Sequence, residues 1–222
     1  MSIGEGAFEN CKYLIEINIP CNITRIENHL FQGCLVLKKI TIPETVTYIG
    51  NYAFQGCNKL SDINIPQSVI NIGQNAFEGC IKISDIDIPD NVTTIGKDAF
   101  LNTAYYNDES NWTDDVLYYK NYLIKAKETL SGSYTIKSGT ERIAGWAFDQ
   151  CTSLSAVEMP FSLKSIGNRA FDSCISITNI TIPGNVEYIG DYAFYSCTGV
   201  TDAIISEGVK RTGKKCLPIV II

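Results

Sequence analysis

The chain has 222 residues, a hydrophobic content of 45% and a formal net charge of −6 at pH 7. The apolar fraction suffices for a continuous core, whereas the acidic balance argues against nucleic acid or an anionic membrane surface as the main partner. No run of about 18 apolar residues occurs, so we expect no direct membrane insertion of this segment.

A unit of 23 residues repeats along the chain, and this repetition overrides any domain count made from length. The unit is L-x-x-I-x-I-P-x-x-V-x-x-I-G-x-x-A-F-x-x-C, as in Leu37 to Cys57. Its phenylalanine recurs at positions 8, 31, 54, 77, 100, 148, 171 and 194, and Leu217 marks a degenerate ninth copy. Such a period predicts a solenoid in which every unit forms one rung.

Each unit contains I-x-I, whose period of two predicts a short strand with one buried face. The pairs expected to point inward are Ile17/Ile19, Ile40/Ile42, Ile63/Ile65, Ile86/Ile88 and Ile180/Ile182. The following proline cannot donate to a ladder, so the strand should end there. V-x-x-I then supplies a second buried wall, and the next glycine suits a tight corner with positive φ. A-F-x-x-C is expected to be one short helical turn that buries Phe and Cys.

The I-P, I-G and A-F-x-x-C signatures strongly resemble the BspA-like, or treponemal-type, leucine-rich repeats, and the match covers nearly the whole chain. The resemblance implies an α/β or mainly β leucine-rich repeat solenoid with a parallel sheet on its concave side. We therefore predict a single solenoid over residues 1–222, with an inserted hairpin segment at 104–130.

The insert lies between Phe100 and Phe148, which are more than one repeat apart. An acidic loop at 107–115 precedes VLYYKNYLIKA at 116–126, which predicts two short strands joined around Lys120-Asn121. Similar insertions in the BspA-like family imply a small hairpin that widens the sheet. The aromatic residues of the insert either pack the hairpin or form a binding surface, and Trp112 and Tyr119 are the candidate anchors for a partner.

Nine cysteines raise the question of metal or disulfide chemistry. The sequence has no C-x-x-C and only one histidine, His29, so we predict no metal site. Equivalent cysteines of stacked rungs would lie at the strand spacing, slightly beyond the roughly 3.5 to 4.5 Å between the Cβ atoms of a disulfide. We expect a ladder of buried, reduced thiols, with Cys21 and Cys216 outside it and exposed.

The residues between the inward isoleucines should form two solvent-facing columns along the strands. The first column is Glu16, Lys39, Asp62, Asp85, Ser133, Ala156, Asn179 and Asp202, and the second is Asn18, Thr41, Asn64, Asp87, Thr135, Glu158 and Thr181. This mildly acidic surface is either plainly solvated or a polar protein interface. Its candidate binding residues are Lys39, Asp62, Asp85, Asp87, Glu158 and Asn179.

The sequence shows no catalytic constellation, because His29 occupies a repeat position held elsewhere by Tyr52 and no phosphate-binding loop or zinc-protease helix occurs. We predict no enzymatic activity and no cofactor. By resemblance, we expect part of a microbial adhesin, at the cell surface or secreted, that binds a host extracellular-matrix protein or other surface proteins. The alternative is a cytoplasmic protein-interaction scaffold, which reduced cysteines favour. We interpret the chain as a fragment of a longer protein, or as one whose targeting segment was removed, since it begins partway through a unit without a signal peptide.

Overall fold

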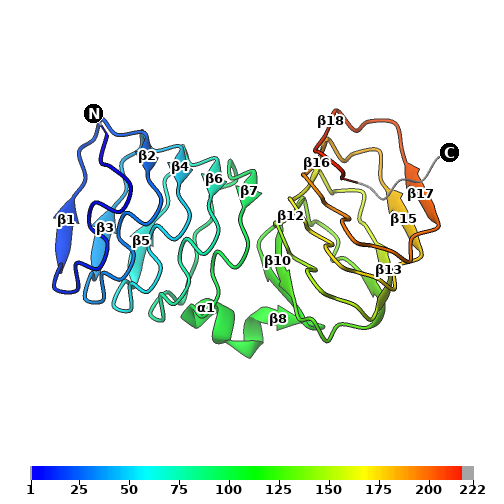
Figure 1. Ribbon diagram of the computed structural model, residues 1–222, viewed down its shortest axis with the longest axis horizontal. Coiled ribbons are helices and arrows are strands. Elements are labelled where there is room, and N and C mark those ends of the chain that lie inside the picture. The colour runs from blue at the N-terminus through cyan, green and yellow to red at the C-terminus, as the bar shows by residue number, and fades with distance from the viewer. Residues whose placement is uncertain (1, 217–222) are drawn as a thin grey trace. The chain divides into compact units, whose positions relative to one another are not determined.

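The computed structural model describes residues 2–216, and the chain divides into two compact units, Met1–Asn111 and Trp112–Ile222. Each unit is a coil of rungs whose short strands stack mainly in parallel (Figure 1). The strand register pairs residues that are one repeat apart, as Ile40 pairs with Ile63. The predicted repeat solenoid is therefore confirmed, and a single continuous solenoid over residues 1–222 stays a prediction.

The N-terminal unit has two parallel sheets, one on each wall of the coil. The I-x-I sheet contains β1 (Glu16–Asn18), β3 (Lys39–Thr41) and β5 (Asp62–Asn64). The V-x-x-I sheet contains β2 (Arg25–Ile26), β4 (Tyr48–Ile49), β6 (Asn71–Ile72) and β7 (Thr94–Ile95). The unit closes with helix α1 (Ala104–Asn107) and the 3₁₀ turn η1 (Glu109–Asn111).

The C-terminal unit begins with the inserted hairpin, whose antiparallel strands are β8 (Trp112–Thr113), β9 (Val116–Tyr119) and β10 (Tyr122–Ala126). The hairpin continues in parallel into β12 (Arg142–Ile143), β14 (Ser165–Ile166), β16 (Tyr188–Ile189) and β18 (Arg211–Thr212). The I-x-I wall carries two pairs, β11 (Gly132–Thr135) with β13 (Leu154–Glu158) and β15 (Asn179–Ile182) with β17 (Asp202–Ile205). The hairpin thus extends the V-x-x-I sheet and not the I-x-I sheet.

Two strand predictions need qualification by the burial pattern. Most of the inward isoleucines are buried as predicted, whereas Ile17, Ile19 and Ile63 are half-buried. Residues 86–88 form no strand, although Ile86 and Ile88 are buried. The amide of Ile88 donates to the carbonyl of Ile86 at 3.0 Å. This rung therefore forms a local turn at the place where the repeat predicts a strand paired with its neighbours.

A stack of phenylalanine rings occupies the core of each unit. In the N-terminal unit the centroids of successive rings from Phe8 to Phe100 lie 5.5, 5.4, 5.3 and 5.5 Å apart. In the C-terminal unit the rings of Phe148, Phe171 and Phe194 lie 4.7 and 4.9 Å apart. The predicted short turn places them there, because the amide of Cys57 donates to the carbonyl of Phe54 at 3.1 Å.

The glycine of the I-G step is not needed for positive φ, contrary to the prediction. A Cβ added at Gly73 would lie 2.5 Å from the amide nitrogen of Asn51 and 2.5 Å from the carbonyl carbon of Gly50. The rungs approach each other so closely here that no side chain fits. Positive φ falls two residues later, at 58° for Tyr52 and 53° for Asn75.

The first prediction concerns the ring stack. Phe54→Ala should lower the free energy of unfolding by about 3 to 5 kcal/mol, because it leaves a cavity between two rings. Phe8→Ala should cost less, since Phe8 is half-buried. Urea denaturation followed by circular dichroism measures both, with Phe161→Ala at a 75% exposed position as the control. Equal losses at Phe8 and Phe54 would contradict a stack stabilised from both sides.

Candidate functional site

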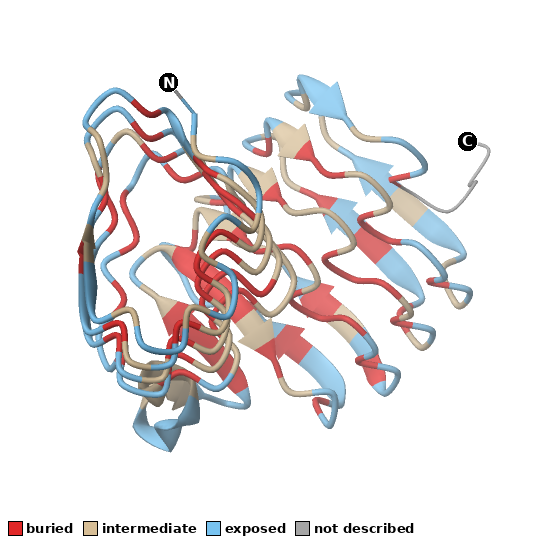
Figure 2. Cartoon of the chain, turned by 60° about the vertical axis from the view of Figure 1, so that its left-hand side comes forward, coloured by how far each residue is buried: buried red, intermediate tan, exposed pale blue. Residues whose placement is uncertain are grey.

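The predicted solvent-facing columns exist on the I-x-I sheet of the N-terminal unit. The register aligns Glu16, Lys39 and Asp62 in one column and Asn18, Thr41 and Asn64 in the other. All six are exposed, and exposed and buried segments alternate around the rungs (Figure 2). The columns form a continuous polar surface along this wall.

Within this surface, Lys39 and Asp62 are brought together. Their Nζ and Oδ2 atoms lie 3.2 Å apart, and both side chains are about two-thirds exposed, at 69% and 67%. Solvent screens such a pair, so it adds little stability and largely cancels its own charge. The acidic character of the face therefore comes chiefly from Asp85 and Asp87, which are exposed on the next rung.

The other predicted face residues lie in the C-terminal unit. Glu158 is exposed on β13 and accepts a hydrogen bond of 2.9 Å from the hydroxyl of Thr135 on β11. Asn179 is exposed on β15 and pairs in register with Asp202 on β17. These side chains continue the polar columns of their own unit.

The hairpin aromatics divide into a packed set and a half-buried set. Tyr118 and Tyr122 are buried, and the hydroxyl of Tyr118 lies 2.9 Å from that of Tyr134. Trp112 and Tyr119 are half-buried, with Lys127 Nζ 5.1 Å from the Trp112 ring centroid and Lys120 Nζ 5.3 Å from that of Tyr119. Packing explains the first set, while Trp112 and Tyr119 stay candidate anchors on the V-x-x-I sheet.

The sequence analysis missed a polar groove on the turns of the C-terminal unit, which we call the turn groove. Its volume is about 490 Å³, and its lining consists of Glu141, Ser162, Lys164, Gly184, Asn185, Glu187, Gly208 and Lys210. Four of these residues occupy one repeat position on successive rungs and alternate in charge, in the order Glu141, Lys164, Glu187 and Lys210. The N-terminal unit has Thr24, Thr47, Ile70 and Thr93 at that position. A comparison of this one column between the two units would have revealed the charged series.

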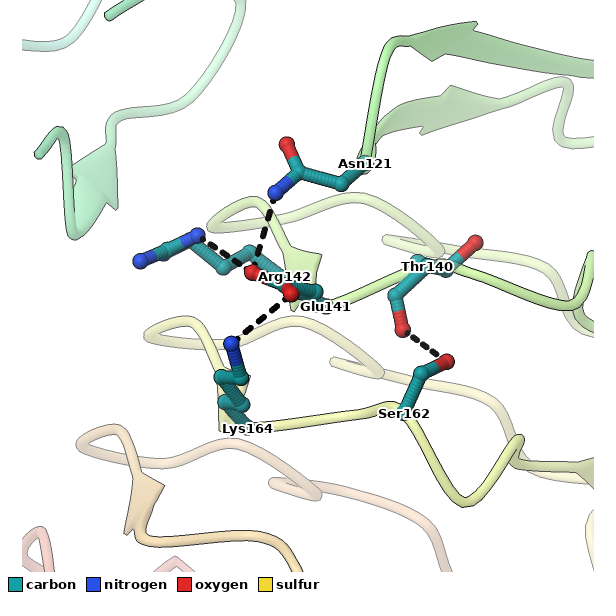
Figure 3. Close-up of polar contacts among 6 residues, drawn as sticks. All are labelled: Asn121, Thr140, Glu141, Arg142, Ser162 and Lys164. Atoms are coloured by element: carbon teal, nitrogen blue, oxygen red, sulfur yellow. Dashed lines mark hydrogen bonds and ion pairs between the residues drawn. The ribbon is translucent and has the colours of Figure 1, made fainter. Parts of the chain in front are cut away.

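The charges of the turn groove are paired within the protein. Glu141 accepts from Lys164 Nζ at 2.7 Å, from Arg142 Nη1 at 3.2 Å and from Asn121 Nδ2 at 3.0 Å (Figure 3). The hydrogen bond from Lys164 holds the pKa of Glu141 below its usual range, so this carboxylate stays ionised. Glu187 and Lys210 form the second pair at 2.9 Å. The lining therefore offers donors and acceptors with no net charge.

The cysteines form an inter-rung hydrogen-bond ladder. The thiol of Cys57 donates to the carbonyl of Phe31 on the preceding rung at 3.2 Å, and that of Cys80 donates to Phe54 at 3.1 Å. Cys174 and Cys197 repeat the contact at 3.1 and 3.0 Å. All four thiols are buried as predicted, and they also link one rung to the next, while their reduced state stays a prediction.

The two cysteines predicted to lie outside the ladder differ in exposure. Cys21 is exposed as predicted, but Cys216 is buried. The reason is that the amide of Phe194 donates to the carbonyl of Cys216 at 3.0 Å, the contact that Phe54 makes with Ala76. Cys216 thus takes the place of the core alanine in a further rung. Leu217, which marks the ninth copy, lies outside the described residues.

The stacked rungs and repeat columns define a β-solenoid of the leucine-rich repeat class. The family model for BspA type leucine rich repeat regions matches six copies over residues 1–107 and 120–218, and the chain belongs to this family. Bacterial proteins built from such repeats are protein-interaction scaffolds. Within the described residues, no helix is long and apolar enough to cross a membrane.

Several solved structures are similar to the chain. A leucine-rich repeat protein from Bacteroides ovatus is 30% identical over 90% of this chain and 48% of its own, with a TM-score of 0.44. A leucine rich cell surface protein from Faecalibacterium prausnitzii is 24% identical over 91% and 69%, with a TM-score of 0.46. The chain spans about half the length of the Bacteroides protein. No curated protein matches it.

The second prediction concerns thiol access. A thiol-specific reagent should label Cys21 rapidly and the half-buried Cys11 more slowly, while the buried thiols should react only when the protein unfolds. Mass spectrometry of peptides from a timed labelling of the native protein measures each rate, with labelling in urea as the reference. Rapid native labelling of Cys57 or Cys174 would show that the ladder is open to solvent.

The third prediction concerns alkaline pH. Burial raises the pKa of Cys34 and Cys151 from 9.0 to about 12. The folded protein therefore holds these protons more tightly than the unfolded chain, and the associated stability is present below pH 9.0 and lost as the pH rises towards 12.

The wild-type urea midpoint should accordingly fall more between pH 7 and about pH 11 than the midpoints of Cys34→Ala and Cys151→Ala, each compared with its own value at pH 7. The exposed Cys21→Ala should follow the wild type. Identical pH profiles in all four proteins would contradict the assigned burial.

Proposed function

We propose that the chain is a non-enzymatic, protein-binding part of a microbial cell-surface adhesin that recognises a host extracellular-matrix protein or another surface protein. The observation that carries this proposal is the register of the I-x-I strands. It aligns equivalent outward side chains, such as Lys39 and Asp62, across successive rungs. A solenoid offers such extended columns as a docking surface.

The charge of the N-terminal unit favours a basic partner. Asp and Glu outnumber Lys and Arg in residues 1–111, while the two kinds are equal in number over residues 112–222. The whole net charge of −6 therefore belongs to the unit that carries Asp85 and Asp87. Attraction between this face and a basic patch would speed association and weaken as salt is added.

The surface location is proposed from the family. Among the similar structures, the protein from Faecalibacterium prausnitzii is described as a cell surface protein. Unpaired cysteines favour the cytoplasmic alternative, but burial of the ladder thiols shields them from extracellular oxidants. An antibody raised against this chain would distinguish the two, because intact cells of the source organism should bind it only if the protein is on the surface.

The fourth prediction tests the docking face by surface plasmon resonance against a panel of matrix proteins. For a matrix protein that the wild type binds, Asp85→Ala/Asp87→Ala should weaken binding about tenfold and flatten its salt dependence. Glu44→Ala/Asp90→Ala is the matched control, since it removes the same charge from exposed turns of the same unit.

Trp112→Ala/Tyr119→Ala tests the candidate anchors of the hairpin separately. A loss of about tenfold or more would identify the hairpin as part of the interface. Tyr13→Ala, at a 93% exposed aromatic residue, serves as its control. A partner that binds both double variants as tightly as the wild type would contradict the proposed face and anchors.

A further inference from the structure

Two glycines in the lining of the turn groove are crowded by the neighbouring rung. Gly184 and Gly208 line the groove on adjacent rungs. A Cβ at Gly184 would lie 2.8 Å from the carbonyl oxygen of Glu207, and one at Gly208 would collide with the carbonyl oxygen of Gly184. Neither glycine carries a side chain, so both contribute only backbone atoms to the lining of the groove.

The rim of the groove presents donors and acceptors together. The Glu141–Lys164 pair at 2.7 Å and the Glu187–Lys210 pair at 2.9 Å are partly exposed. A hydroxyl group both donates and accepts, so one hydroxyl can bridge a carboxylate and its ammonium partner. A charged ligand would instead meet a repulsive group in each pair. The balanced rim therefore favours a neutral ligand rich in hydroxyls.

An exposed aromatic ring stands beside the same turns. Phe161 lies one rung before Gly184 and occupies the same repeat position. In the sequence it directly precedes Ser162, which lines the groove. Its side chain is 75% exposed. A phenylalanine side chain has no polar atom that gains from water, so a ligand with an apolar face would stabilise it by covering it.

We propose that the turn groove binds a neutral oligosaccharide. The sugar hydroxyls would bind the Glu–Lys pairs, and the C–H face of one ring would stack on Phe161. The two Glu–Lys pairs lie two rungs apart, about 10 Å at the strand spacing, so a linear glycan can contact both. This site is independent of the protein-binding face proposed above.

Isothermal titration of the protein with maltohexaose, cellohexaose, mannohexaose and chitohexaose tests the proposal. We expect at least one to bind with a Kd at or below about 1 mM. Phe161→Ala should weaken that binding about tenfold or more, and so should the charge-neutral change Glu187→Ala/Lys210→Ala. Both sites are well exposed, so the fold should remain intact, which circular dichroism checks.

Tyr13→Ala, which removes an even more exposed ring from the N-terminal unit, should leave the affinity unchanged. A heparin hexasaccharide and an alternating Glu-Lys peptide serve as charged comparisons. Three results would overturn the proposal: no saturation by any neutral hexasaccharide at about 10 mM, binding that neither groove variant weakens, or preference for a charged probe.

Discussion

Close stacking of one rung on the next is the constraint on which the rest of this structure depends. The amide of Phe54 donates to the carbonyl of Ala76 on the following rung at 2.8 Å, and the same contact recurs along each unit. This spacing brings the phenylalanine rings into contact and leaves no room for a side chain at Gly73. The recurring Phe, Gly and Cys of the repeat therefore each reflect a contact with a neighbouring rung.

The regular repeat is interrupted at the boundary between the two units, and the local contacts there differ from those of the inner rungs. At the end of the N-terminal unit, Thr103 stands at the position of the ladder cysteine. Its hydroxyl donates a hydrogen bond to the carbonyl of Phe100 on its own rung at 2.8 Å, and it accepts one from the amide of Tyr106 at 3.1 Å. It thereby caps helix α1. At the start of the C-terminal unit, β10 adds a strand to the V-x-x-I sheet, and β9 of the hairpin pairs with its outer edge.

The same stacking produces the surfaces proposed for binding. Equivalent positions lie side by side, so a single change in the repeat alters a whole column. A column that is threonine-rich in the N-terminal unit becomes the alternating Glu141–Lys210 series in the C-terminal unit. Gly184 and Gly208 line the turn groove beside it. The acidic face and the turn groove are thus separate products of one architecture, one suited to a basic protein and the other to a neutral glycan.

The repeat by itself determined which residues face the core. Its period assigns the inward isoleucines, the buried rings and the buried thiol ladder, because repetition reveals every structural position several times. Only the tertiary structure decided the pairing of Lys39 with Asp62, the sheet that the hairpin joins and the burial of Cys216. The turn groove is a further feature that only the tertiary structure decided. Each of these features depends on distances between atoms of different rungs, which are far apart in the sequence. Stacking of the backbone sets those distances, and the pattern of residue types does not specify them.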